Sequence, residues 1–502
     1  MKKMFPILLA LLFIATVFAL VAAPANASTP ESESFAIPVF RDTLENGLRV
    51  IIVPDTNVAV VSCRLYYFVG GMNDGASVTG MSHMYEHMMF KGTKRLGTHD
   101  YQAEIPYLAA IDSLDRLMQR ARRQRGDSDS LYLSYRDEIF SLLNEQRQYI
   151  KKDEIWELYK GAGGTALNAW VSKDMSAYIV TLPMNKVELF YWIEADRMQN
   201  LVLREFHSER DVVLEERRMR HDNRPLNRYW ERLQALFYVA HPFRQPVIGW
   251  ESDIRAFTTE NLMRHINNFY TPCNALIVLA GNISPEQAMD DIRKYFGNIP
   301  RYAGERGDVV TREPPTIGLT RFVMPEDAEP RIDVKFHTPG YPHEDLYALD
   351  IIEGVLSGRT GRLFRRLVDE EQLCMNAGAA NMFRPHNGYF HIFATLKKDT
   401  DPAAVEAIIR EEIEKVVSQV PSDHEILRVA NNIRMSFAEG LKSLEDISDR
   451  LAWFERLGAW QDLFAYPQKI ANVDKETVPK TAARYLRPDL ATWGSIVPKT
   501  ER

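Results

Sequence analysis

The sequence predicts an α+β fold of two similar domains. Each is expected to be a mostly antiparallel β-sheet with helices packed on one face. Strand-like apolar runs alternate with amphipathic helical stretches along the 502 residues. A segment of the first half recurs in the second half at a constant spacing. A stretch rich in proline, glycine and charge, residues 300–316, is predicted to be the linker between the domains.

The first half predicts a sheet interrupted by helices. Strands are expected within residues 43–55, 58–69, 163–183 and 274–282. Asn46 and Gly47 are typical turn residues, and Gly70 and Gly71 end the second run. Ser284 is expected to cap the helix that follows the last strand.

Residues 101–159 predict a helical hairpin inserted into this domain. Leu108, Ile111 and Met118 are spaced for one helix face. Tyr135, Ile139, Leu142 and Tyr149 mark the face of a second helix. Gly126–Ser130 supplies the turn between two arms of about 30 Å each, at 1.5 Å per residue.

The repeat indicates that the second half is a diverged copy of the first. Six residues of the first half have counterparts in the second half at one constant spacing. Those of the first half are Ile254, Phe257, Glu260, Leu262, Phe269 and Pro272, and their counterparts are Ile470, Val473, Glu476, Val478, Tyr485 and Pro488. Thr258 and Asp474 are expected to be matching helix N-caps, and strands begin at Ala275 and Ala491. Coincidence of two amphipathic helices is the alternative. The predicted domains span residues 35–299 and 317–502.

The first residues predict export. Lys2 and Lys3 precede an apolar run that ends at the small-residue site Ala25-Asn26-Ala27, a pattern typical of a secretory signal peptide over 1–27. A retained anchor helix is the alternative. We expect a soluble protein of the periplasm or extracellular space without a stable membrane anchor. Three cysteines argue against a disulfide framework. A formal net charge of −7 gives no case for nucleic acid as a partner.

The most specific motif is His83-x-x-Glu86-His87. On a helix, His83 and His87 lie four residues apart and point the same way, with Glu86 beside that face. Two imidazoles can hold Zn²⁺, and the neighbouring carboxylate can accept a proton from a metal-bound water. A helix with two solvated histidines is the alternative. The motif occurs once, so we expect one Zn²⁺ per chain.

A catalytic zinc ion usually has three protein ligands, so a further carboxylate is expected. Glu209 and Glu216 lie seven residues apart and share one helix face, from which Glu215 points away. We assign Glu216 as the third ligand and Glu209 as the acceptor that orients a ligand histidine. The alternative is that both acids are solvated on a charged helix.

The chain resembles the pitrilysin family of zinc peptidases, which includes insulin-degrading enzyme and mitochondrial processing peptidase. The matching segments are GMSHMYEHMMFKGT, LNAW, ERDVVLEE with DNRP, FYTPCNALIVLAGN and SGRTGRLFRRLVDEEQL. The resemblance covers residues 40–497 apart from the hairpin, and implies a half-length bacterial type. It implies that His83, His87 and Glu216 bind zinc and that Glu86 is the general base.

The family resemblance also implies how substrate binds. The LNAW segment would lie on an edge strand to which a peptide adds as a further strand. Asn168, Ala169 and Trp170 would then contact the substrate. An ordinary strand is the alternative. Paired chains of this family enclose a chamber, which would limit substrate size.

Two departures from the family matter. The gap from His87 to Glu216 is longer than usual because it contains the hairpin, which is expected to project beside the active site. Self-sufficient relatives also carry an Arg and a Tyr in the second half, where this chain has Val368 and Met375. Neither side chain can donate a hydrogen bond to a substrate oxygen. We therefore expect a paralogous, metal-free subunit to supply the pair, or else a second copy of the chain.

The leading hypothesis is a zinc-dependent endopeptidase acting on peptides or unfolded segments. A non-catalytic zinc-binding scaffold or assembly subunit is the alternative, although such a site needs no general base. A third hypothesis is an exported protein that only captures peptides by strand addition. Sensitivity of cleavage to a chelator separates the three.

Overall fold

The computed structural model describes residues 37–302 and 307–499. The predicted signal peptide, 1–27, lies outside the described residues. The described residues from Pro38 onward belong to one compact unit. Within the described residues, no helix is long and apolar enough to cross a membrane.

The first half of the chain forms a six-stranded sheet. Its strands are β1 (Phe40–Thr43), β2 (Arg49–Pro54), β3 (Val60–Tyr67), β4 (Thr165–Val171), β5 (Ser176–Pro183) and β6 (Ala275–Gly281). They lie in the order β1-β2-β6-β3-β5-β4. The β2–β6 pair is parallel and the other pairs are antiparallel. Strand β4 therefore lies at an edge of the sheet.

The second half forms a five-stranded sheet with the same plan. Its strands are β7 (Thr320–Pro325), β8 (Arg331–Pro339), β9 (Cys374–Met382), β10 (Asn387–Leu396) and β11 (Thr492–Val497), in the order β7-β11-β8-β10-β9. The β7–β11 pair is parallel, like the β2–β6 pair of the first sheet. Strands β2 to β6 thus correspond one by one to β7 to β11, and β9 is the counterpart of the edge strand β4. The α+β fold class of two similar, mostly antiparallel sheets is confirmed.

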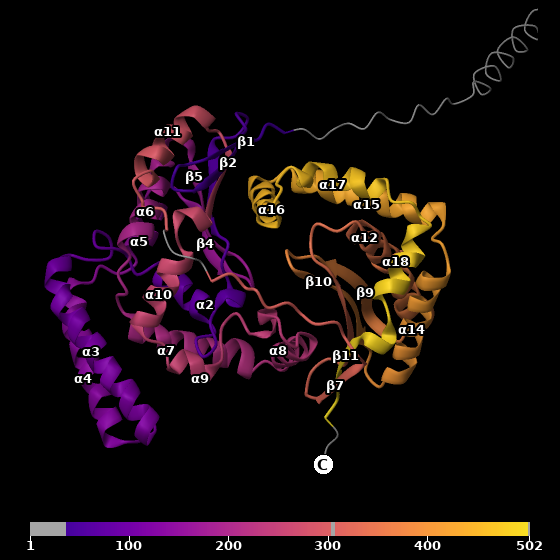
Figure 1. The fold of residues 1–502 in the computed structure, drawn as a ribbon, viewed down its shortest axis with the longest axis horizontal. Helices are drawn as coiled ribbons and strands as arrows, with labels where there is room; N and C mark the ends of the chain where they lie inside the picture. Colours follow the sequence, from indigo (N-terminus) through magenta and orange to yellow (C-terminus); the bar gives the residue numbers. More distant parts are fainter. Residues whose placement is uncertain (1–36, 303–306, 500–502) are drawn as a thin grey trace, which may run out of the picture. The chain divides into compact units, whose positions relative to one another are not determined.

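Helices surround both sheets (Figure 1). In the first half they are α2 (Met81–Met88), α3 (Tyr101–Arg125), α4 (Ser130–Gln146), α5 (Glu154–Gly161), α6 (Glu188–Asn200), α7 (Phe206–Arg217), α8 (Pro225–Phe237), α9 (Glu251–Arg255), α10 (Thr259–Phe269) and α11 (Pro285–Phe296). In the second half they are α12 (Asp345–Leu356), α13 (Arg362–Phe364), α14 (Pro402–Ser418), α15 (Asp423–Gly440), α16 (Leu444–Leu457), α17 (Asp462–Ala471) and α18 (Thr477–Tyr485).

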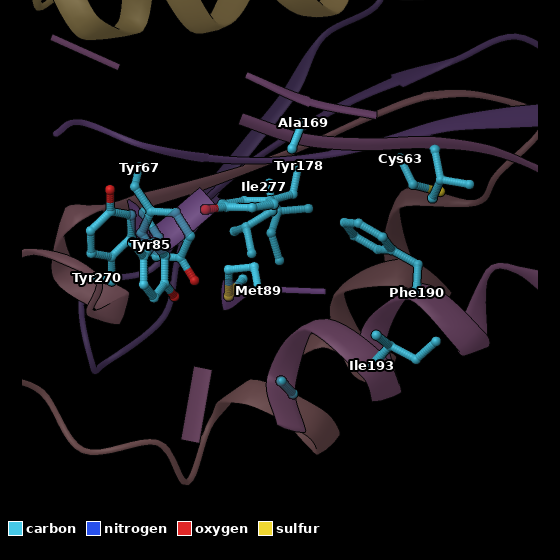
Figure 2. Close-up of a cluster of buried hydrophobic side chains, with 14 of the residues drawn as sticks. Cys63, Tyr67, Tyr85, Met89, Ala169, Tyr178, Phe190, Ile193, Tyr270 and Ile277 are labelled. Atoms are coloured by element: carbon cyan, nitrogen blue, oxygen red, sulfur yellow. The ribbon is translucent and has the colours of Figure 1, made fainter. Parts of the chain in front are cut away.

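The core of the first half lies between the sheet and helices α2 and α6 (Figure 2). Strand β3 alternates, so that Cys63 and Tyr67 enter this core. Helix α2 packs against it through Tyr85, whose ring meets that of Tyr178 edge to face with centroids 6.2 Å apart. This packing fixes the position of the helix that carries the metal motif.

The opposite face of β3 is also covered, by α16 of the second half. Arg64 Nη1 lies 2.9 Å from Asp449 Oδ1, and the Tyr66 hydroxyl donates to the same oxygen. Strand β6 contacts α16 as well and is buried along its whole length. Burial on both faces explains why its sequence is a continuous apolar run rather than an alternating one.

The helical hairpin forms as predicted, with one change at its end. Asp100 and Asp129 cap α3 and α4, which lie side by side and extend away from the first sheet (Figure 1). Ile111, Met118 and Ile139 form their shared core. The second arm ends at Gln146, and α5 follows as a separate helix. At the base, the buried pair Glu104–Arg204, 2.7 Å apart, attaches α3 to the loop before α7.

One predicted helix cap is wrong. Thr258 caps α10 by accepting the Asn261 N–H, as expected. Helix α18 begins later than predicted, at Thr477, with Glu476 in the N-cap position. The Asp474 carboxylate instead accepts the Glu476 N–H at 3.2 Å within the preceding turn. An aspartate stabilises a turn in the same way as it caps a helix, so the pattern does not distinguish the two.

Candidate metal and active site

Local sequence sets the start of the motif helix. Gly80 adopts a left-handed conformation, φ 92°, as the N-cap of α2. In place of a side chain at that position, Asp74 caps the helix, accepting the N–H of Gly80 at 2.8 Å and of Ser82 at 3.0 Å. Asp74 also accepts the Ser82 hydroxyl at 2.7 Å. These bonds hold the first turn of α2, which carries His83.

The structure brings His83, His87 and Glu216 together. Each offers one ligand atom, and these atoms all lie within 4.8 Å of one another. Glu216 Oε2 is 3.6 Å from His83 Nε2 and 3.2 Å from His87 Nε2. Zinc bonds of about 2.0–2.1 Å at tetrahedral angles place two ligand atoms about 3.3 Å apart. The donor set and its spacing therefore fit a zinc ion.

Glu209 lies beside His87, one of the two histidines predicted to bind the metal. Its Oε2 is 3.2 Å from His87 Nδ1, and the Lys91 ammonium forms an ion pair with its other oxygen. Burial lowers the pKa of His87, but hydrogen bonds to Glu209 and Glu216 outweigh it and raise that pKa to about 9. Glu209 is thus placed to hold the Nδ1 proton and leave Nε2 to face a metal.

Glu86 lies on α2 with His83 and His87, and all three side chains line one cavity. Burial raises the pKa of the Glu86 carboxyl, as does the negative charge of Glu216, whereas His87 lowers it. A raised pKa makes a carboxylate a better proton acceptor, which is the property that a general base needs. Glu215 also lines this cavity, but it is not grouped with the candidate ligand atoms, and its exposed carboxylate is bound to Arg218 at 2.7 and 2.9 Å.

His83, His87 and Glu216 line a cavity of about 790 Å³. Asn168, Ala169 and Trp170 of β4 line it together with the ligands. Asn168 is exposed, Ala169 is buried, and the Trp170 ring meets Tyr66 with centroids 6.3 Å apart. The predicted substrate-contacting strand and the metal site therefore share one cavity, and among the described residues β4 pairs with β5 alone.

Arg220 is a site residue that sequence reasoning missed. Its guanidinium lies 2.6 Å from Glu216 Oε1, the oxygen turned away from the histidines. It is placed by η4 (Arg218–Asp222), a turn of π-helix that directly follows α7. Spacing of four residues from Glu216 was a signal for this pair. Asp74 was also missed, because nothing local shows that it caps α2.

The two second-half positions singled out from the sequence lie elsewhere. Val368 is in η7 (Arg365–Glu370), and Met375 is half-exposed on β9. Neither is among the described residues that line the metal cavity.

Family profiles match both halves. "Insulinase (Peptidase family M16)" matches residues 49–111, which include the metal motif. "Peptidase M16 inactive domain" matches residues 256–433, most of which belong to the second half.

Related proteins of known sequence carry zinc protease names. "Zinc protease PqqE" of Helicobacter pylori is 24% identical over 465 residues, covering 91% of this chain and 92% of the relative. A zinc protease of Bacillus subtilis, YmxG, is 23% identical over 70% of both chains. The "probable mitochondrial-processing peptidase subunit beta" of Arabidopsis thaliana is 22% identical over 88% of this chain and 75% of its own.

Solved structures share the fold. A protease from Helicobacter pylori superposes with a TM-score of 0.77 at 23% identity, covering 92% of this chain and all of the other. The periplasmic protease PqqL from Escherichia coli superposes with a TM-score of 0.70 at 16% identity, covering 93% of this chain and 48% of PqqL. Both family profiles match in chain order, and over most of its length the chain is similar to zinc proteases, so its resemblance is to the insulinase (M16) family of peptidases.

Proposed function

We propose that this chain is a zinc-dependent endopeptidase that hydrolyses peptides or unfolded segments. The observation that carries the proposal is the convergence of His83, His87 and Glu216 beside Glu86, in a cavity bordered by the free edge of β4. When bound, zinc would polarise the scissile carbonyl and make a water molecule more acidic. The zinc protease names of the relatives support the same conclusion.

Each residue has a defined role in this proposal. His83, His87 and Glu216 hold the metal, and Glu209 keeps His87 oriented through its Nδ1 atom. Glu86 accepts a proton from the attacking water and passes it to the leaving amine. The β4 edge aligns the substrate backbone through Asn168, Ala169 and Trp170, a mode that gives affinity with little dependence on side chains.

The proposal includes export, two domains and a second subunit. Residues 1–27 would direct export, and 35–299 and 317–502 would be the catalytic and non-catalytic domains joined by 300–316. The shared strand order of the two sheets supports this division. A metal-free paralogue, or a second copy, would supply substrate contacts that Val368 and Met375 cannot make. PqqL is matched over 48% of its length and so has room for a second such half.

The test is cleavage of a quenched peptide library by purified protein, alone and with a co-purified companion chain. We expect cleavage that a zinc chelator abolishes and added Zn²⁺ restores. Glu86→Gln is expected to retain zinc, measured by metal analysis, and to lose turnover. Zinc at full occupancy without cleavage in any combination would favour the scaffold alternative. Peptide binding unaffected by chelator would favour a capture protein.

A further inference from the structure

A second cavity, of about 580 Å³, adjoins the metal cavity. His221, Val247 and Ile248 line both. The remaining walls come from α8 and the segment after it, from β8 and β10 of the second sheet, and from the turns between β4 and β5 and between β9 and β10. A peptide bound at the metal can therefore place a neighbouring side chain, or its terminus, in this second cavity.

Positive charge gathers in this cavity. Lys173, Lys335 and Arg384 all line it. Lys335 is 3% exposed, and its ammonium donates to Gln234 Oε1 at 2.7 Å. Lys173 donates to the carbonyl oxygen of Gln245. Both ammonium groups are thus held in place by neutral oxygens.

Burial and the positive charge of a neighbouring side chain lower the pKa values of both lysines. Burial, and then the positive charge of Lys173, lower the pKa of Lys335 to about 7. Burial and the charge of Arg384 lower the pKa of Lys173 to about 8. Glu231 is the one carboxylate among the described residues that line the cavity, and Arg217 holds it by two bonds of 3.1 Å. Arg384 is already paired with the buried Asp174 carboxylate at 3.1 Å. An anion entering the cavity would therefore chiefly offset the repulsion between Lys335 and Lys173.

A neutral donor points to the same kind of ligand. Tyr238 lines the cavity and is fully buried, and its hydroxyl has no hydrogen-bond partner among the described residues. Buried hydroxyls are normally hydrogen-bonded, because an unpaired one loses its interaction with water without replacement. An oxygen of a bound anion would accept this bond. The rings of Trp230, Phe243 and Tyr389 would pack against an aliphatic stem.

We propose that this cavity is a subsite for a carboxylate of the substrate peptide. The carboxylate belongs to an aspartate or glutamate side chain near the scissile bond, or to the C-terminus of the peptide. Lys335, Lys173 and the Tyr238 hydroxyl would bind its two oxygens. The assignment rests on the proposed function, since the peptide bound at the metal is what reaches this cavity.

The test uses zinc-loaded Glu86→Gln protein, so that binding is read without turnover. Fluorescent peptides carry Glu or Gln at one position at a time, and a free or amidated C-terminus, and fluorescence anisotropy gives their Kd values. We expect the carboxylate at one of these places to tighten binding roughly tenfold. Lys335→Met should abolish that difference, whereas Lys294→Met, which removes a surface lysine of α11, should leave it intact.

The position that shows the preference distinguishes a side-chain carboxylate from a terminal one. Circular dichroism checks that Lys335→Met folds, and Lys173→Met replaces it if it does not. Equal affinity for every acid and amide pair, a preference that survives both lysine substitutions, or no peptide binding at all would overturn the subsite. If wild-type protein instead lacks chelator-sensitive cleavage while the acid preference persists, the hydrolase proposal fails and the subsite stands.

Discussion

Glu209 Oε2 lies 3.2 Å from His87 Nδ1, on the side of the imidazole opposite Glu216. One histidine of the metal site thus has a carboxylate at each ring nitrogen. The Lys91 ammonium contacts the other oxygen of Glu209 and fixes its direction. The arrangement determines which nitrogen of His87 is free for a metal.

Glu209→Gln is expected to weaken zinc binding about 10- to 100-fold, because an amide is a poorer acceptor for the Nδ1 proton. Competition with a chromophoric zinc chelator measures the affinity. The matched control is Glu205→Gln, since Glu205 also contacts Lys91, at 3.4 Å, but is not a partner of His87. Similar losses in both variants would mean that Lys91, rather than the carboxylate on His87, determines the affinity.

Gly80→Ala is expected to displace the motif helix. A Cβ at Gly80 would lie 2.4 Å from the Ile248 carbonyl oxygen, and φ is already +92°. Strain plus a backbone clash is expected to cost more than about 2 kcal/mol in the free energy of unfolding, with weaker zinc binding.

Gly126→Ala is the control for that clash. Gly126, at the hairpin tip, has a similar φ of +89° but nothing within 4 Å of the added Cβ. Its expected cost is about 1 kcal/mol of strain, with zinc affinity unchanged. Urea unfolding and chelator competition on both variants check this. Equal losses of stability would show that backbone strain alone, and not the approach of Ile248, makes Gly80 necessary.

The secondary-structure elements that could be predicted are those determined by residues close together in the sequence. The hairpin arms follow from the spacing of apolar residues such as Ile111 and Met118. The motif helix was expected from the four-residue spacing of its histidines, and the edge position of β4 was implied only by the family resemblance. The convergence of His87 and Glu216 follows less directly, because it needs two helices from distant segments and was inferred from zinc's need for a third ligand.

Features made by packing between distant segments could not be predicted. The contact of Arg64 with Asp449 joins residues far apart in the chain, and neither residue shows it in its own neighbourhood. The same holds for the second cavity, where Lys335 reads in sequence as an ordinary strand residue. Arg220 differs from these, because its spacing of four residues from Glu216 was a local signal for their ion pair, although Arg220 itself lies in a π-turn after α7.

Glu425 is expected to make the stability of the folded protein depend on pH in the acidic range. It accepts two bonds from Arg362, at 2.8 and 3.0 Å, and forms a capping box with Ser422 at the start of α15. Burial raises the pKa of Glu425, but these bonds outweigh it and lower that pKa from 4.5 to about 2. The pKa of this carboxyl is lower in the folded protein than in the unfolded chain, so its ionised form stabilises the folded state. This stabilisation is complete above about pH 5 and is lost as the pH falls from about 4.5 towards 2.

Glu425→Gln is therefore expected to lower the free energy of unfolding at pH 7 by about 1 kcal/mol, a value limited by solvent screening of this partly exposed pair. The difference from wild type should shrink between about pH 5 and pH 3.5. Urea unfolding across that range measures it. Glu371→Gln, which removes an exposed partner of Arg366, is expected to change stability by less than about 0.5 kcal/mol. A Glu425 effect that does not vary with pH would exclude the ion pair as its source.

The side chain of Asn168 on β4 is expected to help align the substrate. Asn168 is exposed in the metal cavity, and on its sheet side it pairs with Ile179 of β5, which leaves the outer edge of β4 free. Asn168→Ala is expected to lower kcat/KM for peptides roughly tenfold, because about 1.4 kcal/mol of hydrogen bonding to the substrate is lost. Zinc affinity should stay unchanged, since Asn168 is not a ligand.

The matched control for Asn168 is Asn376→Ala on β9, the corresponding edge strand of the second sheet. Asn376 is exposed like Asn168 but does not line the metal cavity. Steady-state cleavage of one quenched peptide by both variants, with zinc content measured in parallel, separates the two edges. A loss of kcat/KM in both would mean that substrate contacts both sheets, and a loss in neither would mean that the Asn168 side chain makes no hydrogen bond to the substrate.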